Sequence, residues 1–156
     1  MRIPALLLAS LAVAPTAAVP ARAAGSGDLP YWASLTADVV NMRVGPARDY
    51  KILWVYKRKL LPLRVIRLHE GWRLVEDPDG ARGWVLARFL SRKQTAIVQG
   101  ATAEMRDKPG AGRVLWRAEP GVVGKVGKCE AGWCKFDVAG RAAWIRAEAV
   151  WGEGKP

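Results

Sequence analysis

The chain has 156 residues and a formal net charge of +11, and 51% of its residues are hydrophobic. This length allows one ordinary domain or two very small ones, and it excludes a large two-domain enzyme or a transporter. The chain contains eight Trp but only one His and two Cys. A His-rich metal centre is therefore excluded, and a Ser-His-Asp or Cys-His catalytic site would have to use His69.

The first 23 residues have the pattern of a secretory signal peptide. Arg2 supplies a positive charge, an Ala- and Leu-rich run covers 5–13, and small residues surround Ala23. A retained membrane anchor is the alternative, but a spanning helix needs about 20 apolar residues, and Pro15 and Pro20 interrupt this segment. We predict cleavage after Ala23 and a periplasmic or secreted protein.

The chain that remains after cleavage is strongly basic. In a cytoplasmic protein this charge would suggest a nucleic-acid partner. An exported protein meets anionic envelope polymers, lipid head groups and acidic proteins instead, so no nucleic-acid partner is expected. Solubility alone is the other explanation of the charge.

The rest of the chain contains two similar units. One Met and three Trp recur in the same order and at spacings that agree to one residue: Met42, Trp54, Trp72 and Trp84 in the first unit, and Met105, Trp116, Trp133 and Trp144 in the second. Such self-similarity indicates an internal duplication. We place the first unit at 33–92 and the second at 98–152. Units this small are near the limit for independent folding, which favours packing of the two against each other.

Short apolar segments between turns predict an all-β fold for each unit. Residues 63–68 are rich in branched apolar side chains, and 77–80 have the Asp-Pro-Asp-Gly sequence of a tight turn. The second unit shortens this turn to Ala139-Gly140, which suits a two-residue hairpin loop. Turn signals recur at intervals of about 8–12 residues, a pattern that predicts two tandem small β-barrels.

The sequence Asn-Met-Arg-Val-Gly-Pro at 41–46, followed by Gly71-Trp72 and Gly83-Trp84-Val85, resembles the bacterial SH3 domain, also called SH3b. The second unit departs from this pattern at Glu104 and in the Asp-Lys-Pro sequence at 107–109. The resemblance covers nearly the whole exported chain. It implies two SH3-like barrels of about five to six strands each, without catalytic machinery. Members of this family serve as targeting modules, often for cell-wall peptidoglycan or its peptides.

Cys129 and Cys134 flank a four-residue turn. Residues that face each other at the base of a hairpin have Cα atoms about 4.5–5.5 Å apart, a separation that a disulfide accepts, and exported compartments are oxidising. We predict a Cys129–Cys134 disulfide, which closes a short loop and contributes about 2 kcal/mol. A redox or metal pair is the alternative, but redox motifs usually have two intervening residues and a zinc site needs more ligands.

Aromatic and basic side chains predict a binding groove in the first unit. The Trp residues of the central hairpins, Trp72, Trp84, Trp133 and Trp144, are expected to be buried or half-buried. The remaining aromatic residues, Trp54 and Trp116 with Tyr31, Trp32, Tyr50 and Tyr56, are candidates to line an open groove that binds an extended peptide or a sugar. The basic run at 57–59 is either a solvated loop or an anion contact beside that groove.

The candidate ligand-binding residues are Arg43, Tyr50, Trp54, Tyr56, Lys57 and Arg58. His69 lies in a turn without a neighbouring nucleophile, which is typical of a surface residue, and no catalytic residue, metal site or cofactor is predicted. The sequence predicts a non-catalytic exported SH3-like protein that binds peptidoglycan or a wall-derived peptide in the cell envelope. The alternative is a periplasmic adaptor that recognises an envelope protein through the aromatic groove.

Overall fold

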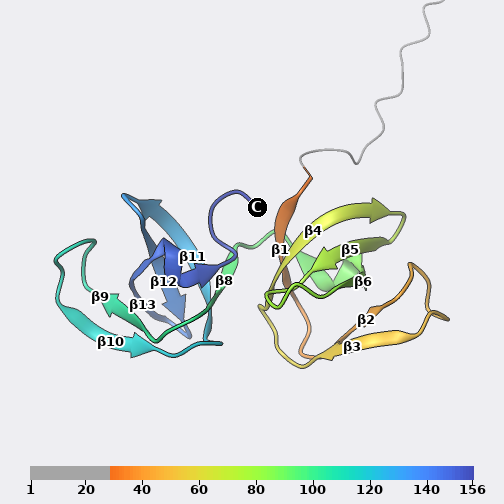
Figure 1. Cartoon of the computed structure of the whole chain (residues 1–156), viewed down its shortest axis with the longest axis horizontal. Helices are drawn as coiled ribbons and strands as arrows, with labels where there is room; N and C mark the ends of the chain where they lie inside the picture. Colours follow the sequence, from red (N-terminus) through yellow and green to blue (C-terminus); the bar gives the residue numbers. More distant parts are fainter. Residues whose placement is uncertain (1–28) are drawn as a thin grey trace, which may run out of the picture.

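The computed structural model describes residues 29–156, which form two β-structures side by side (Figure 1). The predicted signal peptide lies outside the described residues. Within them, no helix has the length and apolar character needed to cross a bilayer. Each β-structure is one seven-stranded antiparallel sheet with a single turn of 3-10 helix before its last strand, so the all-β prediction is confirmed.

The first structure, called repeat one, contains the strands β1 to β7 in the order β3-β2-β6-β5-β4-β1-β7. Its elements are β1 (Tyr31–Leu35), β2 (Val40–Arg43), β3 (Ile52–Tyr56), β4 (Pro62–His69), β5 (Trp72–Glu76), β6 (Arg82–Leu86), η1 (Ala87–Phe89) and β7 (Leu90–Ser91). Each sheet has more strands than the expected five to six because the short final strand, two residues long in both repeats, returns to pair with the first.

The second structure, called repeat two, has the equivalent order β10-β9-β13-β12-β11-β8-β14. Its elements are β8 (Thr95–Val98), β9 (Ala103–Arg106), β10 (Val114–Ala118), β11 (Val123–Glu130), β12 (Trp133–Val138), β13 (Arg141–Arg146), η2 (Ala147–Ala149) and β14 (Val150–Trp151). The duplication predicted from the spacing of Met and Trp is therefore a duplication of the whole strand order.

The recurring methionines are buried in the two cores. Met42 and Met105 are 1% and 0% exposed, respectively, each on the second strand of its repeat. Strand β2 alternates buried and half-buried residues, as a strand with one face on a core does. The Trp residues of the central hairpins also follow the prediction, since Trp72, Trp84 and Trp133 are buried and Trp144 is half-buried.

The two cores contain different large side chains at equivalent places. Leu63 and Val75 of repeat one are both fully buried. The equivalent residues of repeat two are Gly124 and Phe136, and a Cβ atom on Gly124 would lie 2.7 Å from the Phe136 ring. The phenyl ring of Phe136 therefore occupies the space that a side chain at position 124 would need.

Two turn predictions agree with the structure. Cys129 and Cys134 lie opposite each other on β11 and β12 and form a disulfide, as predicted. Both sulfur atoms are thus engaged, and neither is available to a metal. Ala139 and Gly140 both have positive φ values, 52° and 88°, which is the conformation of a two-residue type I′ hairpin loop.

Side chains and backbone groups connect the two repeats. The indole nitrogen of Trp32 donates a hydrogen bond to the carbonyl of Glu153 at 3.1 Å, and the Trp32 ring meets the edge of Trp151 with centroids 4.6 Å apart. On another side, Gln99 Nε2 donates to the carbonyl of Pro78 at 3.0 Å. These contacts bring β1 and the 77–81 turn of repeat one close to repeat two.

Candidate functional site

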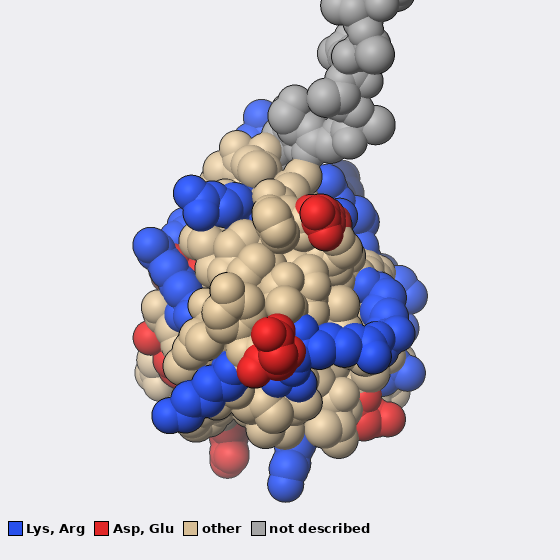
Figure 2. All heavy atoms as spheres, turned by 90° about the vertical axis from the view of Figure 1, so that its right-hand side faces the viewer, with Lys and Arg blue, Asp and Glu red and all other residues tan. Residues whose placement is uncertain are grey.

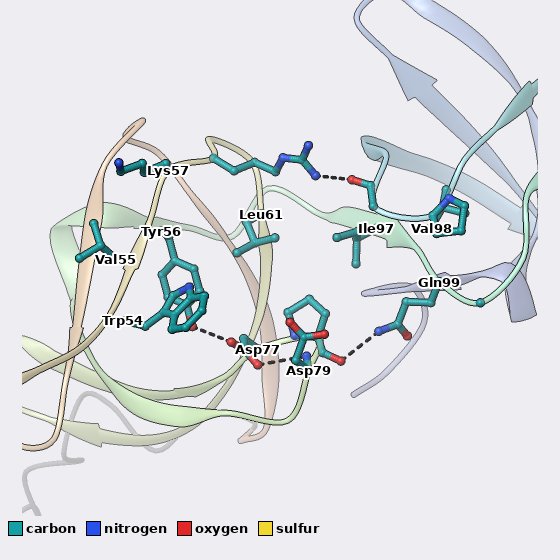
Figure 3. Close-up of a pocket in the computed structure, with 15 residues that line it drawn as sticks. Trp54, Val55, Tyr56, Lys57, Leu61, Asp77, Asp79, Ile97, Val98 and Gln99 are labelled. Atoms are coloured by element: carbon teal, nitrogen blue, oxygen red, sulfur yellow. Dashed lines mark hydrogen bonds between the residues drawn. The ribbon is translucent and has the colours of Figure 1, made fainter.

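A cleft of about 780 Å³ lies between the two repeats (Figure 3). Repeat one supplies the end of β3, the segment that follows it and the 77–81 turn, whereas repeat two supplies residues 97–100 and 120–121. The aromatic and charged residues that line the cleft are Trp54, Tyr56, Lys57, Arg58, Asp77 and Asp79.

Trp54 is the exposed aromatic residue of this cleft. It lies opposite Met42 in the β2–β3 pairing, and 58% of its surface is exposed. Strand β3 lies at one edge of its sheet. A flat apolar surface of this kind suits a sugar ring or the side chain of a peptide.

Tyr56 forms a buried wall of the cleft rather than an exposed contact surface. The residue is 5% exposed, and its hydroxyl donates a hydrogen bond to Asp77 Oδ2 at 3.0 Å. The other carboxylate oxygen of Asp77 accepts hydrogen bonds from the backbone N–H groups of Asp79 at 3.0 Å and Ala81 at 2.8 Å. Asp77 therefore fixes the turn and ties it to β3 (Figure 3).

Burial raises the pKa of the Tyr56 hydroxyl far above its ordinary value, and the negative charge of Asp77 raises it further. In the unfolded chain Tyr56 loses its proton above about pH 10, whereas in the folded protein it keeps the proton. This group therefore stabilises the fold below pH 10, and its contribution falls as the pH rises further.

We expect the free energy of unfolding to fall by about 1 kcal/mol per pH unit above pH 10 because of Tyr56. Denaturant unfolding between pH 9 and 11 should show a steeper decline for the wild type than for Tyr56→Phe; parallel declines would contradict this prediction.

The rim of the cleft carries charges of both signs. Lys57, Arg58 and Asp79 are exposed, and all three line the cleft. Arg58 also donates a hydrogen bond to the carbonyl of Gly121, so it joins the two repeats as well as contributing positive charge. Of the two carboxylates in the cleft, Asp79 is the one that a ligand can reach. Asp77 is 6% exposed and already accepts three hydrogen bonds.

The structure separates the six predicted residues into two places. Trp54, Tyr56, Lys57 and Arg58 line the inter-repeat cleft, whereas Arg43 and Tyr50 do not. Arg43 Nη1 donates to the carbonyl of Tyr50 at 2.6 Å and so closes the loop between β2 and β3. Arg43 also lines a separate pocket of about 280 Å³ on repeat one.

Repeat two explains why an arginine recurs at this position. Arg106, the equivalent of Arg43, donates to the carbonyls of Gly110 at 3.2 Å and Gly112 at 2.7 Å. The same side chain thus holds the same loop in both repeats. This shared role accounts for the repeated Met-Arg sequence without requiring a ligand.

Two further expectations about the aromatic residues need correction. Trp116 is half-buried and packs against the core of repeat two, in which the residue equivalent to Tyr56 is the small, buried Ala118. Tyr31 and Trp32 line a different pocket of about 700 Å³, so they do not share a groove with Trp54.

Sequence reasoning missed the acidic side of the cleft and the contribution of repeat two. Asp77 and Asp79 belonged to a recognised turn, but nothing in the sequence placed that turn beside Trp54. Gln99 and Gly121 reach the cleft only because the repeats pack together. No local sequence signal could have identified them.

Residues 36–92 and 99–152 each match the model of the family described as bacterial SH3 domain. The chain therefore belongs to the bacterial SH3 domain family and contains two such domains in tandem. These domains are known as cell-wall-binding modules. The family and the disulfide together point to an extracytoplasmic protein.

The solved structures of NlpC2 and NlpC1 from Trichomonas vaginalis are similar to this chain at 12% identity, with TM-scores of 0.38 and 0.37. The alignments cover 82% and 88% of this chain but 50% and 51% of those proteins, so the chain spans about half their length. No curated protein matches the chain.

Proposed function

We propose that this protein binds peptidoglycan or a wall-derived peptide in the inter-repeat cleft, without catalysing a reaction on it. The observation that carries the proposal is the exposed Trp54 in a cleft that both family domains line and that also has groups of opposite charge among its lining residues. A site formed by residues of both domains also accounts for the presence of two domains in one chain.

The cleft offers complementary contacts for a short peptide that carries both carboxylate and amino groups. The Lys57 ammonium can pair with a ligand carboxylate, and the exposed Asp79 carboxylate can accept hydrogen bonds from a ligand amine. Trp54 supplies apolar contact area in the same cleft. The crosslinking peptides of the wall carry both kinds of group.

Export is part of the same proposal. Cleavage after Ala23 would place the mature protein in the periplasm or outside the cell, where its positive charge meets anionic envelope polymers. The charge then increases the rate of encounter, and the cleft provides the specific contacts.

Trp54→Ala tests the cleft directly. A central Trp in a binding site contributes about 2 kcal/mol or more, which corresponds to roughly thirtyfold weaker binding. We expect that loss when the retention of purified protein on isolated cell-wall sacculi is measured by sedimentation. Lys57→Gln and Asp79→Asn should each weaken retention less, because both side chains are exposed.

Leu115→Ala is the matched control, because Leu115 is 46% exposed on the edge strand of repeat two and does not line the cleft. Its retention should equal that of the wild type. Wild-type protein found entirely in the supernatant at low salt, or equal retention of Trp54→Ala and the wild type, would refute the proposed function.

A further inference from the structure

Strand β3 presents an apolar edge to solvent. The four consecutive residues Ile52, Leu53, Trp54 and Val55 are 40%, 47%, 58% and 40% exposed. The strand lies at the end of its sheet, and β2 is the one strand that pairs with it in the part of the chain that the structure describes. Proteins usually protect such an edge with charged residues, Pro or a covering segment, because its free N–H and C=O groups can pair with another chain.

Repeat two shows the protected form of the same edge. Its strand β10 has Arg117 where β3 has Val55, and Arg117 lies 3.8 Å from Glu104 as an ion pair. Trp116, the equivalent of Trp54, is half-buried. Leu115 alone among the large apolar side chains of β10 is exposed, at 46%. The equivalent edge strands of the two repeats therefore differ: β10 contains a charged residue, whereas β3 exposes apolar residues.

We propose that β3 is an addition site for an extended segment of a partner protein that has an apolar centre and acidic residues at both ends. The charges that flank the strand lead to this partner. Lys51 precedes the apolar run, and the basic residues at 57–59 follow it. Figure 2 shows that this end of the molecule carries Lys and Arg side chains, together with some acidic ones, across largely uncharged surface. Acidic residues at both ends of an added strand would lie beside these cations.

The same charges disfavour pairing with a second copy of this chain. Antiparallel pairing of two β3 strands would place Lys51 of one chain near the 57–59 run of the other. Parallel pairing would place each basic segment beside the same segment of the other chain. Like charges directly opposite each other destabilise a strand pair. A strand with acidic ends removes this repulsion and gains the main-chain hydrogen bonds of the open edge.

This surface goes beyond the proposed wall-binding function, and a residue on β3 separates the two. Leu53 is 47% exposed and does not line the cleft, whereas Trp54 does. A change at Leu53 should therefore affect the added strand without affecting ligand binding in the cleft.

A labelled synthetic peptide of the sequence Glu-Glu-Thr-Val-Thr-Val-Thr-Glu-Glu is the probe, and fluorescence anisotropy measures its binding to the purified protein. We expect binding that weakens at least tenfold in Leu53→Glu, with slower hydrogen exchange of β3 amides in the wild-type complex. Leu115→Glu should bind as the wild type does. The same peptide with Lys in place of its four Glu residues should not bind.

Several outcomes would overturn the proposal. They are no binding of the acidic-ended peptide, equal binding of the Lys-ended peptide, or binding that Leu53→Glu leaves unchanged. A dimer that sedimentation detects in the wild type but not in Leu53→Glu would show that a second copy covers β3 instead. Retention of Leu53→Glu on sacculi should remain at the wild-type level, so failure here and failure of the proposed function are distinguishable. Because Leu53 is 47% exposed, thermal unfolding should confirm that the variant folds.

Discussion

Phe136→Ala is expected to lower the free energy of unfolding by about 3–5 kcal/mol, because the ring is completely buried and its removal leaves a cavity. The neighbouring Gly124 has no side chain that could fill the space. Small domains have a total stability of about 5–15 kcal/mol, so we expect a clearly lower denaturation midpoint, measured by urea unfolding with Trp fluorescence.

The other repeat supplies the compensating variant. Gly124→Leu combined with Phe136→Val copies the Leu63 and Val75 pair of repeat one and should recover a large part of the lost stability. Leu115→Ala, at an exposed position, is the control and should cost less than about 1 kcal/mol. A loss below about 1 kcal/mol in Phe136→Ala would show that the ring is not the centre of the second core.

Asp77→Ala should cost about 2–4 kcal/mol, because three hydrogen bonds to a buried carboxylate disappear together. The buried Tyr56 hydroxyl loses its acceptor, and the 77–81 turn loses the group that fixes its backbone. Equilibrium unfolding in denaturant measures the effect. Asp77→Asn keeps an acceptor for the turn and should cost less.

A double-mutant cycle with Tyr56→Phe isolates the contact between β3 and the turn. If the hydroxyl and the carboxylate stabilise each other, Asp77→Ala should cost at least about 1 kcal/mol less in the Tyr56→Phe background. Asp137→Ala is a useful comparison in repeat two, where a turn carboxylate accepts one hydrogen bond from the Gly140 backbone at 2.7 Å. A cycle without coupling would contradict the structural role assigned to Asp77.

Much of the fold could be predicted because its signals are local or repeated. The spacing of Met and Trp revealed the duplication, and the Ala139-Gly140 turn and the cysteine pair each lie within one hairpin. Hydrophobic patterning sets which face of a strand is buried, and turn residues set where strands reverse. These features depend on neighbours in sequence.

The candidate site was harder to predict because it depends on contacts between distant segments. Tyr56 was expected on an open groove, but a buried carboxylate twenty-one residues later holds its hydroxyl. Arg43 was expected to meet a ligand, but it holds the carbonyl of Tyr50. The sequence specifies which functional groups are present. Tertiary packing determines whether each group is available to a ligand or contacts other residues of the protein.

The unequal cores also bear on how the chain avoids misassembly while it folds. Neighbouring domains of similar sequence can exchange strands and become trapped in hybrid structures. A hybrid barrel that paired β4 with β12 would force Leu63 against Phe136, and the reciprocal pairing of β11 with β5 would leave Gly124 and Val75 around an empty space. Overcrowding and voids are both unfavourable, so the divergence of these two positions directs each strand to the barrel in which it belongs.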